Sequence, residues 1–343
     1  MTDVNLSTAG DGACRSLEIV ILDVGHGNCA VVYDGAARLI VDVAQETILL
    51  EELRFSGNRS VDHLVLSHAD ADHIRGAAAL LAHSDFEVGC LWSNADSTKD
   101  SDTFLDLMYA ARDRHKAGRL RVKTSLNVGA DSDLCVGGVK VEVLHPGVVF
   151  GMRGPSSRRR PEGVISSNSM SAVLRVGSYD QKAVLLPGDL DHVGLQSIVD
   201  EGVDISAPVL VFPHHGGRSG SSNDRDFARR LCSLVSPKLV IFSHGRHNFR
   251  NPRKEIVDGI RDALGAVDII CTQLSRSCHA STDVPMPMHL NGRPSRGRLN
   301  NSCCGGSITV WVDPEGVTWS PEPSSHARYL DLIDTPLCRA VKA

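Results

Sequence analysis

The sequence predicts an α+β protein in which two mixed β-sheets pack face to face and helices flank them, an αββα sandwich. Two observations predict this fold. Short apolar strands come first along the chain, and strands then alternate with helices. Nearly every apolar strand ends in a cluster of His, Asp and Gly residues, so we expect the strand ends to form one shared site.

The composition supports a packed core and limits the partners. Of the 343 residues, 42% are apolar and only 4% are aromatic, so the core must consist mainly of Val, Leu, Ile and Ala. The net charge is −5, which excludes a uniformly basic surface for nucleic acid. Any contact with nucleic acid must therefore be local.

The periodicity of apolar residues predicts the individual elements. We expect strands at 17–22, 29–33, 38–42, 61–67, 86–92, 139–144, 170–176, 183–186, 209–212, 239–242 and 308–312. We expect helices at 47–55, 72–82 and 103–117, from 189 to about 199, and at 253–264.

One hydrolase-sized domain is expected at 15–320, with a Cys- and His-containing elaboration at about 265–312. Residues 151–163 and 281–301 are expected to be exposed loops, and 321–343 a loosely attached polar tail. No signal peptide and no run of about 18 apolar residues is evident, which favours a cytoplasmic protein without membrane contact and with mostly reduced thiols.

The segment 61–76, VDHLVLSHADADHIRG, carries the strongest chemical signal. An apolar strand delivers the chain to His68, Asp70, Asp72 and His73 at the start of a helix. Such a turn can direct two side chains to one metal and two to a second metal about 3.5–4 Å away. A charged loop that merely caps a helix is the simpler interpretation, but four ligand-type residues in six positions argue against it.

This segment resembles the HxHxDH signature of metallo-β-lactamase-fold hydrolases, in the HxDxDH form typical of the soluble hydrolase domain of the competence protein ComEC and its free-standing relatives. Other segments resemble further motifs of that family in the same order. They are LDVGHGN at 22–28, LIVD at 39–42, Asn168 with SAVL at 171–174, LLPGD at 185–189 and VFPHHG at 211–216.

The resemblance implies two divalent metal ions, Zn or Mn, and assigns roles to further residues. Asp189 would bridge both metals and act with Asp72 in catalysis, although it could also be a helix N-cap. One of His214 and His215 would complete a metal shell, with His215 slightly favoured, and the other would orient a ligand or the substrate. The residues expected to support the ligands from behind are Asp23, Asp42 and Asn168.

The sequence also departs from the family. His26 and Asn28 stand where the family has Gln and Asp. His26 could be an extra ligand or a proton donor, but we expect a solvent-facing loop residue. No third His is found at 168–171, so the site is richer in oxygen donors, and both Zn and Mn remain open.

For the substrate, the resemblance favours a phosphodiester, in DNA or a nucleotide. Arg218, Arg246 and His247 are expected to bind it, because arginine forks pair well with phosphates, and His244 is proposed as the proton donor. The basic loop with Arg153, Arg158, Arg159 and Arg160 fits this role and a merely solvated surface equally well. Because aromatic residues are few near these loops, base stacking on exposed rings is not expected.

A cluster in the C-terminal elaboration could hold a structural zinc and pin the 281–301 loop over the site. Its residues are Cys271, Cys278, His279, Cys303 and Cys304. The spacing is not that of paired CxxC motifs, so ordinary reduced thiols are the favoured interpretation.

Two other functions remain open at this point. The same metals could hydrolyse esters, lactones or amides, and a metal-stabilised module could bind a partner without catalysis. Free-standing relatives often occur in bacterial defence operons, which implies a protein partner encoded nearby. The oligomeric state does not follow from the sequence.

Overall fold

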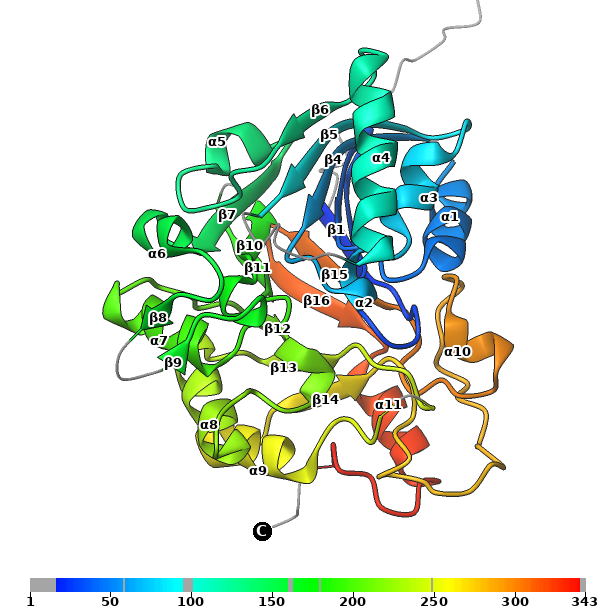
Figure 1. Ribbon diagram of the computed structural model, residues 1–343. Coiled ribbons are helices and arrows are strands. Elements are labelled where there is room, and N and C mark those ends of the chain that lie inside the picture. Colours follow the sequence, from blue (N-terminus) through cyan, green and yellow to red (C-terminus); the bar gives the residue numbers. More distant parts are fainter. Residues whose placement is uncertain are drawn as a thin grey trace, which may run out of the picture.

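Two β-sheets pack face to face in the computed structural model, and helices cover their outer faces (Figure 1). The structure describes residues 17–57, 59–94, 101–159, 163–178, 180–247 and 249–339. The predicted αββα sandwich with two mixed sheets is confirmed.

The first sheet has eight strands in the order β16-β15-β1-β2-β3-β4-β5-β6. They are β1 (Leu17–Ile21), β2 (Ala30–Asp34), β3 (Ala37–Val41), β4 (Ser60–Leu66), β5 (Glu87–Ser93), β6 (Arg121–Lys123), β15 (Ile308–Asp313) and β16 (Gly316–Ser320). The helices that follow its strands are α1 (Glu46–Phe55), α2 (Ala71–Ile74), α3 (Ala77–Ala82) and α4 (Asp102–Lys116). Their apolar residues, such as Leu49 and Leu80, form one core layer with the outer face of this sheet.

The second sheet has six strands in the order β14-β13-β12-β11-β10-β7. They are β7 (Val139–His145), β10 (Val173–Ser178), β11 (Lys182–Leu186), β12 (Val209–Val211), β13 (Leu239–Phe242) and β14 (Asp268–Cys271). The helices on its outer face are α7 (His192–Asp200), α8 (Asp224–Val235), α9 (Lys254–Leu264) and α11 (Pro323–Leu330). The remaining short elements are α5 (Asp131–Leu134), α6 (Val148–Arg153), β8 (Arg158–Arg159), β9 (Gly163–Val164), η1 (Asn168–Met170), η2 (Pro213–Gly216) and α10 (Arg296–Leu299).

The strand directions place the site. Aliphatic side chains from both inner faces, such as Ile19, Val184 and Ile241, fill the space between the sheets. Strands β3, β4 and β5 are parallel to one another, and so are β11 to β14. Because parallel strands end at the same edge of a sheet, the polar clusters that follow them are brought together at one edge of the sandwich.

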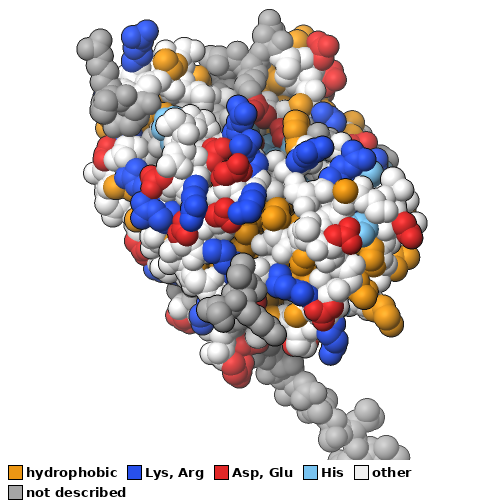
Figure 2. Space-filling model, turned by 90° about the horizontal axis from the view of Figure 1, so that it is seen from below, with side chains coloured by type: hydrophobic (Ala, Val, Ile, Leu, Met, Phe, Trp, Pro, Cys, Tyr) orange, Lys and Arg blue, Asp and Glu red, His pale blue; other side chains and the backbone are white. Residues whose placement is uncertain are grey.

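Figure 2 shows the molecule from below. On the face seen there, basic and acidic side chains lie side by side, and neither sign of charge dominates. On α9, for example, Lys254 Nζ lies 2.7 Å from Asp258 Oδ2. Exposed pairs of this kind contribute little to stability and leave no broad basic surface on this face.

Several sequence-based expectations are corrected by the structure. The helix expected at 72–82 is two helices, because Gly76 packs so closely that a Cβ there would lie 2.5 Å from Glu46 N. The 151–163 loop contains the end of α6 and the β8–β9 hairpin instead. The tail after Pro321 is not loose: α11 is amphipathic, and Tyr329 and Ile333 are buried in the core against the six-stranded sheet.

The sequence analysis also missed whole elements. Helix α8 was overlooked although Phe227, Leu231 and Val235 repeat at helical spacing and Asn223 caps its first turn. Within the described residues no helix has the length and the apolar content needed to cross a lipid bilayer.

Gly188, between β11 and Asp189, is expected to be sensitive to substitution. Its φ is +54°, and a Cβ there would lie 2.2 Å from Ser171 Oγ and 2.7 Å from Ser67 Oγ. We expect Gly188→Ala to lower the free energy of unfolding by about 2 kcal/mol more than Gly202→Ala, measured by urea denaturation of the metal-free protein. Gly202 is a matched control, since its φ is +65° but a Cβ there would meet nothing within 4 Å. Equal losses in the two variants would contradict this account.

Candidate metal centre

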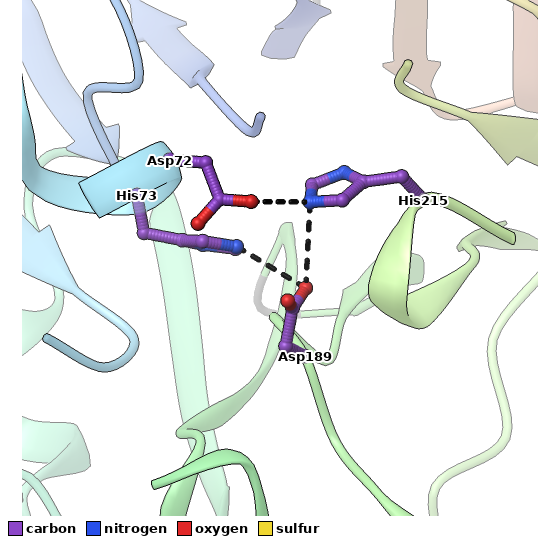
Figure 3. A group of neighbouring side chains, drawn as sticks. All are labelled: Asp72, His73, Asp189 and His215. Carbon is purple, nitrogen blue, oxygen red and sulfur yellow. Dashed lines mark ion pairs between the residues drawn. The ribbon is translucent and has the colours of Figure 1, made fainter. Parts of the chain in front are cut away.

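Four side chains from both halves of the sandwich converge on one point (Figure 3). Asp72 and His73 come from α2, Asp189 follows β11, and His215 lies in η2 after β12. Their ligand atoms all lie within 4.8 Å of one another, and all but Asp72 are buried. His73 Nε2 is 3.1 Å from Asp189 Oδ1, and His215 Nε2 is 3.3 Å from Asp72 Oδ2.

Hydrogen bonds behind the rings fix which nitrogen of each histidine faces the centre. His73 Nδ1 donates to Asp42 Oδ2 at 2.7 Å, and His215 Nδ1 donates to the Ser243 carbonyl at 2.8 Å. Each Nε2 is therefore directed at the centre, and both are buried without a hydrogen-bond partner. This is the arrangement that presents an imidazole lone pair to a metal ion.

A second set of side chains lies on the other side of Asp189. His68 Nε2 is 3.6 Å from Asp70 Oδ2 and 3.9 Å from Asp189 Oδ2. His214 Nδ1 is 3.3 Å from the same Asp189 oxygen. The two carboxylate oxygens of Asp189 thus face different histidines: Oδ1 faces His73 and His215, and Oδ2 faces His68 and His214.

The adjacent histidines reach both sides because the chain turns sharply there. His214 and His215 have φ values of 52° and 55°, in the left-handed region. In an extended strand two neighbouring side chains would point to opposite faces. The sequence analysis favoured His215 as the ligand, and His215 does belong to the four-residue group; His214 faces Asp189 as well.

The charges in the group are strongly coupled. Burial opposes ionisation of Asp189, yet His73, His214 and His215 hold its pKa well below the usual value. Burial likewise opposes the charged form of His73, but Asp189 and Asp42 hold its pKa well above the usual value. A buried carboxylate surrounded by imidazoles with unpartnered nitrogens fits a divalent cation, with nitrogen donors that suit Zn and oxygen donors that suit Mn.

His26 is not the solvent-facing loop residue that we expected. Its side chain is only 14% exposed, and Nε2 lies 3.4 Å from Asp72 Oδ2. Its ring centroid lies 4.5 Å from that of His215. The β1–β2 loop folds back over the edge of the sandwich, and Asn28 N donates to Asp72 O at 3.2 Å, which brings His26 to the centre.

The expected supporting residues have clear contacts. Asp42 accepts from Ser67 N and from His73, and so connects β3 with the turn that carries the ligands. Asp23 is fully buried and accepts from Gly25 N, which holds the loop before His26 as expected. Asn168 lies in η1, next to Ser167, whose hydroxyl is 3.5 Å from Asp70 Oδ1; the Asn168 Oδ1 atom is buried without a hydrogen-bond partner.

Two of the expected catalytic and substrate-binding residues have surroundings that do not fit the predicted roles. The Arg246 side chain is buried, and its guanidinium donates to the carbonyls of Leu274, His279 and Ser281, so it braces a loop rather than binding substrate. His244 is fully buried, and burial lowers its pKa to about 3. A neutral ring without access to solvent does not fit the role of proton donor.

The other basic candidates lie on the surface. Arg218 and His247 are exposed on the loops that follow β12 and β13. Arg153 and Arg158 are exposed, whereas Arg159 forms an ion pair with Asp200 and lies over the Phe150 ring. Arg160 lies outside the described residues.

The five residues considered for a structural zinc do not form one group of ligands in the described part of the chain, in line with the favoured interpretation of ordinary thiols. Cys303 Sγ lies 3.3 Å from Ser295 Oγ, and Cys304 Sγ lies 3.3 Å from His326 Nε2. His279 Nδ1 lies 2.9 Å from Asp334 Oδ2. Cys271 and Cys278 are buried in the apolar core against the six-stranded sheet.

Comparisons with known proteins agree with the family resemblance found in the sequence motifs. Residues 22–244 match the family model described as the metallo-beta-lactamase superfamily. The chain is 26% identical over 263 residues to competence protein ComA of Neisseria gonorrhoeae, covering 75% of this chain and 31% of the relative. It is 26% identical over 217 residues to ComE operon protein 3 of Bacillus subtilis, covering 62% of this chain and 24% of the relative. The chain therefore spans about a third or less of the length of these curated relatives.

Among solved structures, the chain is similar to the metallo hydrolase Igni18 of Ignicoccus hospitalis, with a TM-score of 0.45 and 17% identity over 74% of this chain and 94% of the other. It is also similar to the metallo-beta-lactamase fold protein YhfI of Bacillus subtilis, with a TM-score of 0.45 and 12% identity over 74% of this chain and 96% of the other.

Metal binding is expected to release a proton from His73. Because its pKa is held well above the usual value, His73 is protonated at neutral pH in the metal-free protein, and a metal must displace that proton. Affinity should therefore rise as the pH rises toward the pKa of His73. Calorimetric titration with Zn²⁺ in two buffers of different ionisation enthalpy should show release of about one proton. Asp42→Asn, which removes a charge that favours the proton, should reduce this release; identical heats in the two buffers would contradict the assignment.

His26 is expected to orient Asp72. We expect His26→Ala to weaken metal binding about tenfold, whereas His26→Gln, which keeps a side-chain N–H, should recover most of the affinity. Competition with a chelating dye measures this directly. His83→Ala, a partly buried histidine at the C-terminal end of α3 and outside the metal group, is the control. Unchanged affinity in His26→Ala would show that the loop histidine only packs beside the centre.

Proposed function

Because the chain belongs to the metallo-beta-lactamase superfamily, we propose that it is a metal-dependent hydrolase that binds two divalent cations and cleaves phosphodiesters in DNA or nucleotides. The observation that supports two cations most directly is the division of the Asp189 carboxylate. Its Oδ1 faces one pair of histidines and its Oδ2 faces another. A carboxylate shared in this way suits a pair of metals held close together.

The residues present supply a donor set for each cation. One set is Asp72, His73 and His215 with Asp189 Oδ1, and the other is His68, Asp70 and His214 with Asp189 Oδ2. Two cations bound there would lower the pKa of a water between them and stabilise negative charge on the substrate.

The protein itself orients the donors and defines the side from which a substrate approaches. His68 and His73 are fully buried, whereas the side chains of Asp70 and Asp72 are 26% and 27% exposed. The opening therefore lies beside these two carboxylates. Asp42 and the Ser243 carbonyl hold His73 and His215 in place, so little reorganisation is needed when the substrate arrives.

Similarity to the relatives favours a phosphodiester substrate over other hydrolysable bonds. One curated relative is named competence protein ComA, and its match covers 75% of this chain. Arg218 is exposed and follows His215 by three residues, and we expect its guanidinium to pair with a phosphate of the substrate.

The test combines metal content with activity. We expect elemental analysis of protein loaded with Zn²⁺ or Mn²⁺ to give about two ions per chain, and the loaded protein to cleave bis(p-nitrophenyl) phosphate and single-stranded DNA. Asp72→Ala should lower the rate by at least about 100-fold, since one cation loses a ligand and its stabilisation of the transition state. Asp204→Asn, an exposed carboxylate that pairs with Lys182, should leave the rate unchanged.

Each other outcome has a distinct meaning. Bound metal with hydrolysis of p-nitrophenyl acetate or a lactone, but of no phosphodiester, would replace this proposal by an ester or amide hydrolase. Absence of bound metal under every loading condition would refute the catalytic proposal.

A further inference from the structure

The β13–α9 loop places an exposed aromatic ring next to the metal centre. Phe249 is 57% exposed, and its ring centroid lies 4.6 Å from that of His26. His26 in turn contacts Asp72 and the ring of His215. The three rings thus form a row that leads from the surface to the ligands of the centre.

We propose that Phe249 stacks on a nucleobase of the substrate, so that the site binds phosphodiesters that carry bases more tightly than simple phosphate diesters. This inference rests on the proposed phosphodiesterase function. It corrects the expectation from sequence that no exposed ring near the site would be available for stacking.

The β13–α9 loop, which carries the ring, packs closely against the β1–β2 loop. Ser243 Oγ donates to Gly27 O at 2.8 Å. Gly245 packs so tightly that a Cβ there would lie 2.7 Å from His26 N. The start of the β13–α9 loop is therefore anchored on the loop that carries His26, and Phe249 is held beside the side of the centre that Asp72 leaves open.

The exposure of Phe249 differs from that of the other exposed aromatic rings, each of which lies beside a guanidinium group. Two other aromatic side chains among the described residues are more than half exposed, Phe55 at 61% and Tyr109 at 53%. The guanidinium of Arg293 lies 5.4 Å from the centroid of Phe55, and that of Arg112 lies 4.9 Å from the centroid of Tyr109. Phe249 contacts His26 on its inner side and leaves more than half of its surface to solvent, next to a site that must receive a substrate.

The charges around the ring suit a nucleic-acid strand. Arg250 follows Phe249 and is exposed, and so is Arg276. The two segments adjoin, because Ser277 Oγ donates to the Arg250 carbonyl at 3.4 Å. An aromatic face flanked by arginines is the combination by which proteins bind single strands: the ring stacks on a base and the guanidinium groups pair with phosphates.

The experiment compares two esters with the same leaving group. The p-nitrophenyl ester of thymidine 5′-monophosphate carries a base, and methyl p-nitrophenyl phosphate does not. In Phe249→Ala and Phe249→Leu we expect KM for the thymidine ester to rise about tenfold with little change in kcat, while both constants for the methyl ester stay the same. Phe249→Trp should restore the low KM, and Tyr109→Ala should affect neither ester. The metal content of every variant is measured alongside.

The outcomes separate the two proposals. Equal changes for both esters, or a Phe249→Leu variant that matches the wild type, would show that the ring only packs against His26 and would overturn the inference. Unchanged constants in Phe249→Ala would overturn it as well. If the wild-type protein hydrolyses neither ester, the phosphodiesterase function itself fails.

Discussion

The Asp189 carboxylate lies where the two sheets meet, and the geometry of the rest of the site depends on how its charge is compensated. It is almost fully buried, and a buried charge of this kind costs several kcal/mol unless other groups offset it. His68 approaches it from the turn between β4 and α2, and His73 approaches it from α2. His214 and His215 approach it from the turn after β12. Without metal, the proton held on His73 supplies part of the compensation; in the proposed holoprotein, cations replace it. The site can therefore exist only when both halves of the sandwich are assembled.

The C-terminal segment supports the site from behind through hydrogen bonds and ion pairs. The Asp23 carboxylate accepts hydrogen bonds from Gln273 Nε2 and Gly297 N. It therefore connects the β1–β2 loop with one residue before the 281–301 region and one residue within it. Arg293 forms ion pairs with Glu18 and Glu52 on the outer side of the eight-stranded sheet. Of these contacts, the hydrogen bonds to Asp23 hold the loop that carries His26. The cysteines, for which ordinary reduced thiols were the favoured interpretation, are buried, and burial raises the pKa of the Cys271 and Cys304 thiols well above the usual value.

The sequence predicts which residues lie at the ends of strands. It does not predict the direction in which the side chain of a loop residue points. His68, Asp72 and His73 were named as candidate ligands because several ligand-type residues follow one strand, and Asp189 was named because its segment resembles a motif of the family. The direction of a loop side chain is set by distant segments. Arg246 was misassigned because its partners, the carbonyls at 274–281, lie far along the chain. His26 and Phe249 were missed for the same reason, since the packing of residues 25–27 against 243–245 has no local signal.

The pair His214–His215 shows how the chain can do without the third histidine that the sequence analysis looked for near Asn168. The side chains of two neighbouring residues face one carboxylate only if the backbone leaves the extended conformation, as it does at His214 and His215. Left-handed backbone at a non-glycine residue costs on the order of 1–3 kcal/mol. The following residues maintain this turn. Gly217 N donates to His214 O at 2.7 Å, and a Cβ at Gly216 would lie 2.7 Å from the Phe242 ring and from Pro252. The turn is thus pressed against β13 and the start of α9, the same segments that flank Phe249. Tight packing at this one place therefore fixes two of the histidines and the exposed ring beside them, which would couple the geometry of the metal ligands to the position of the substrate.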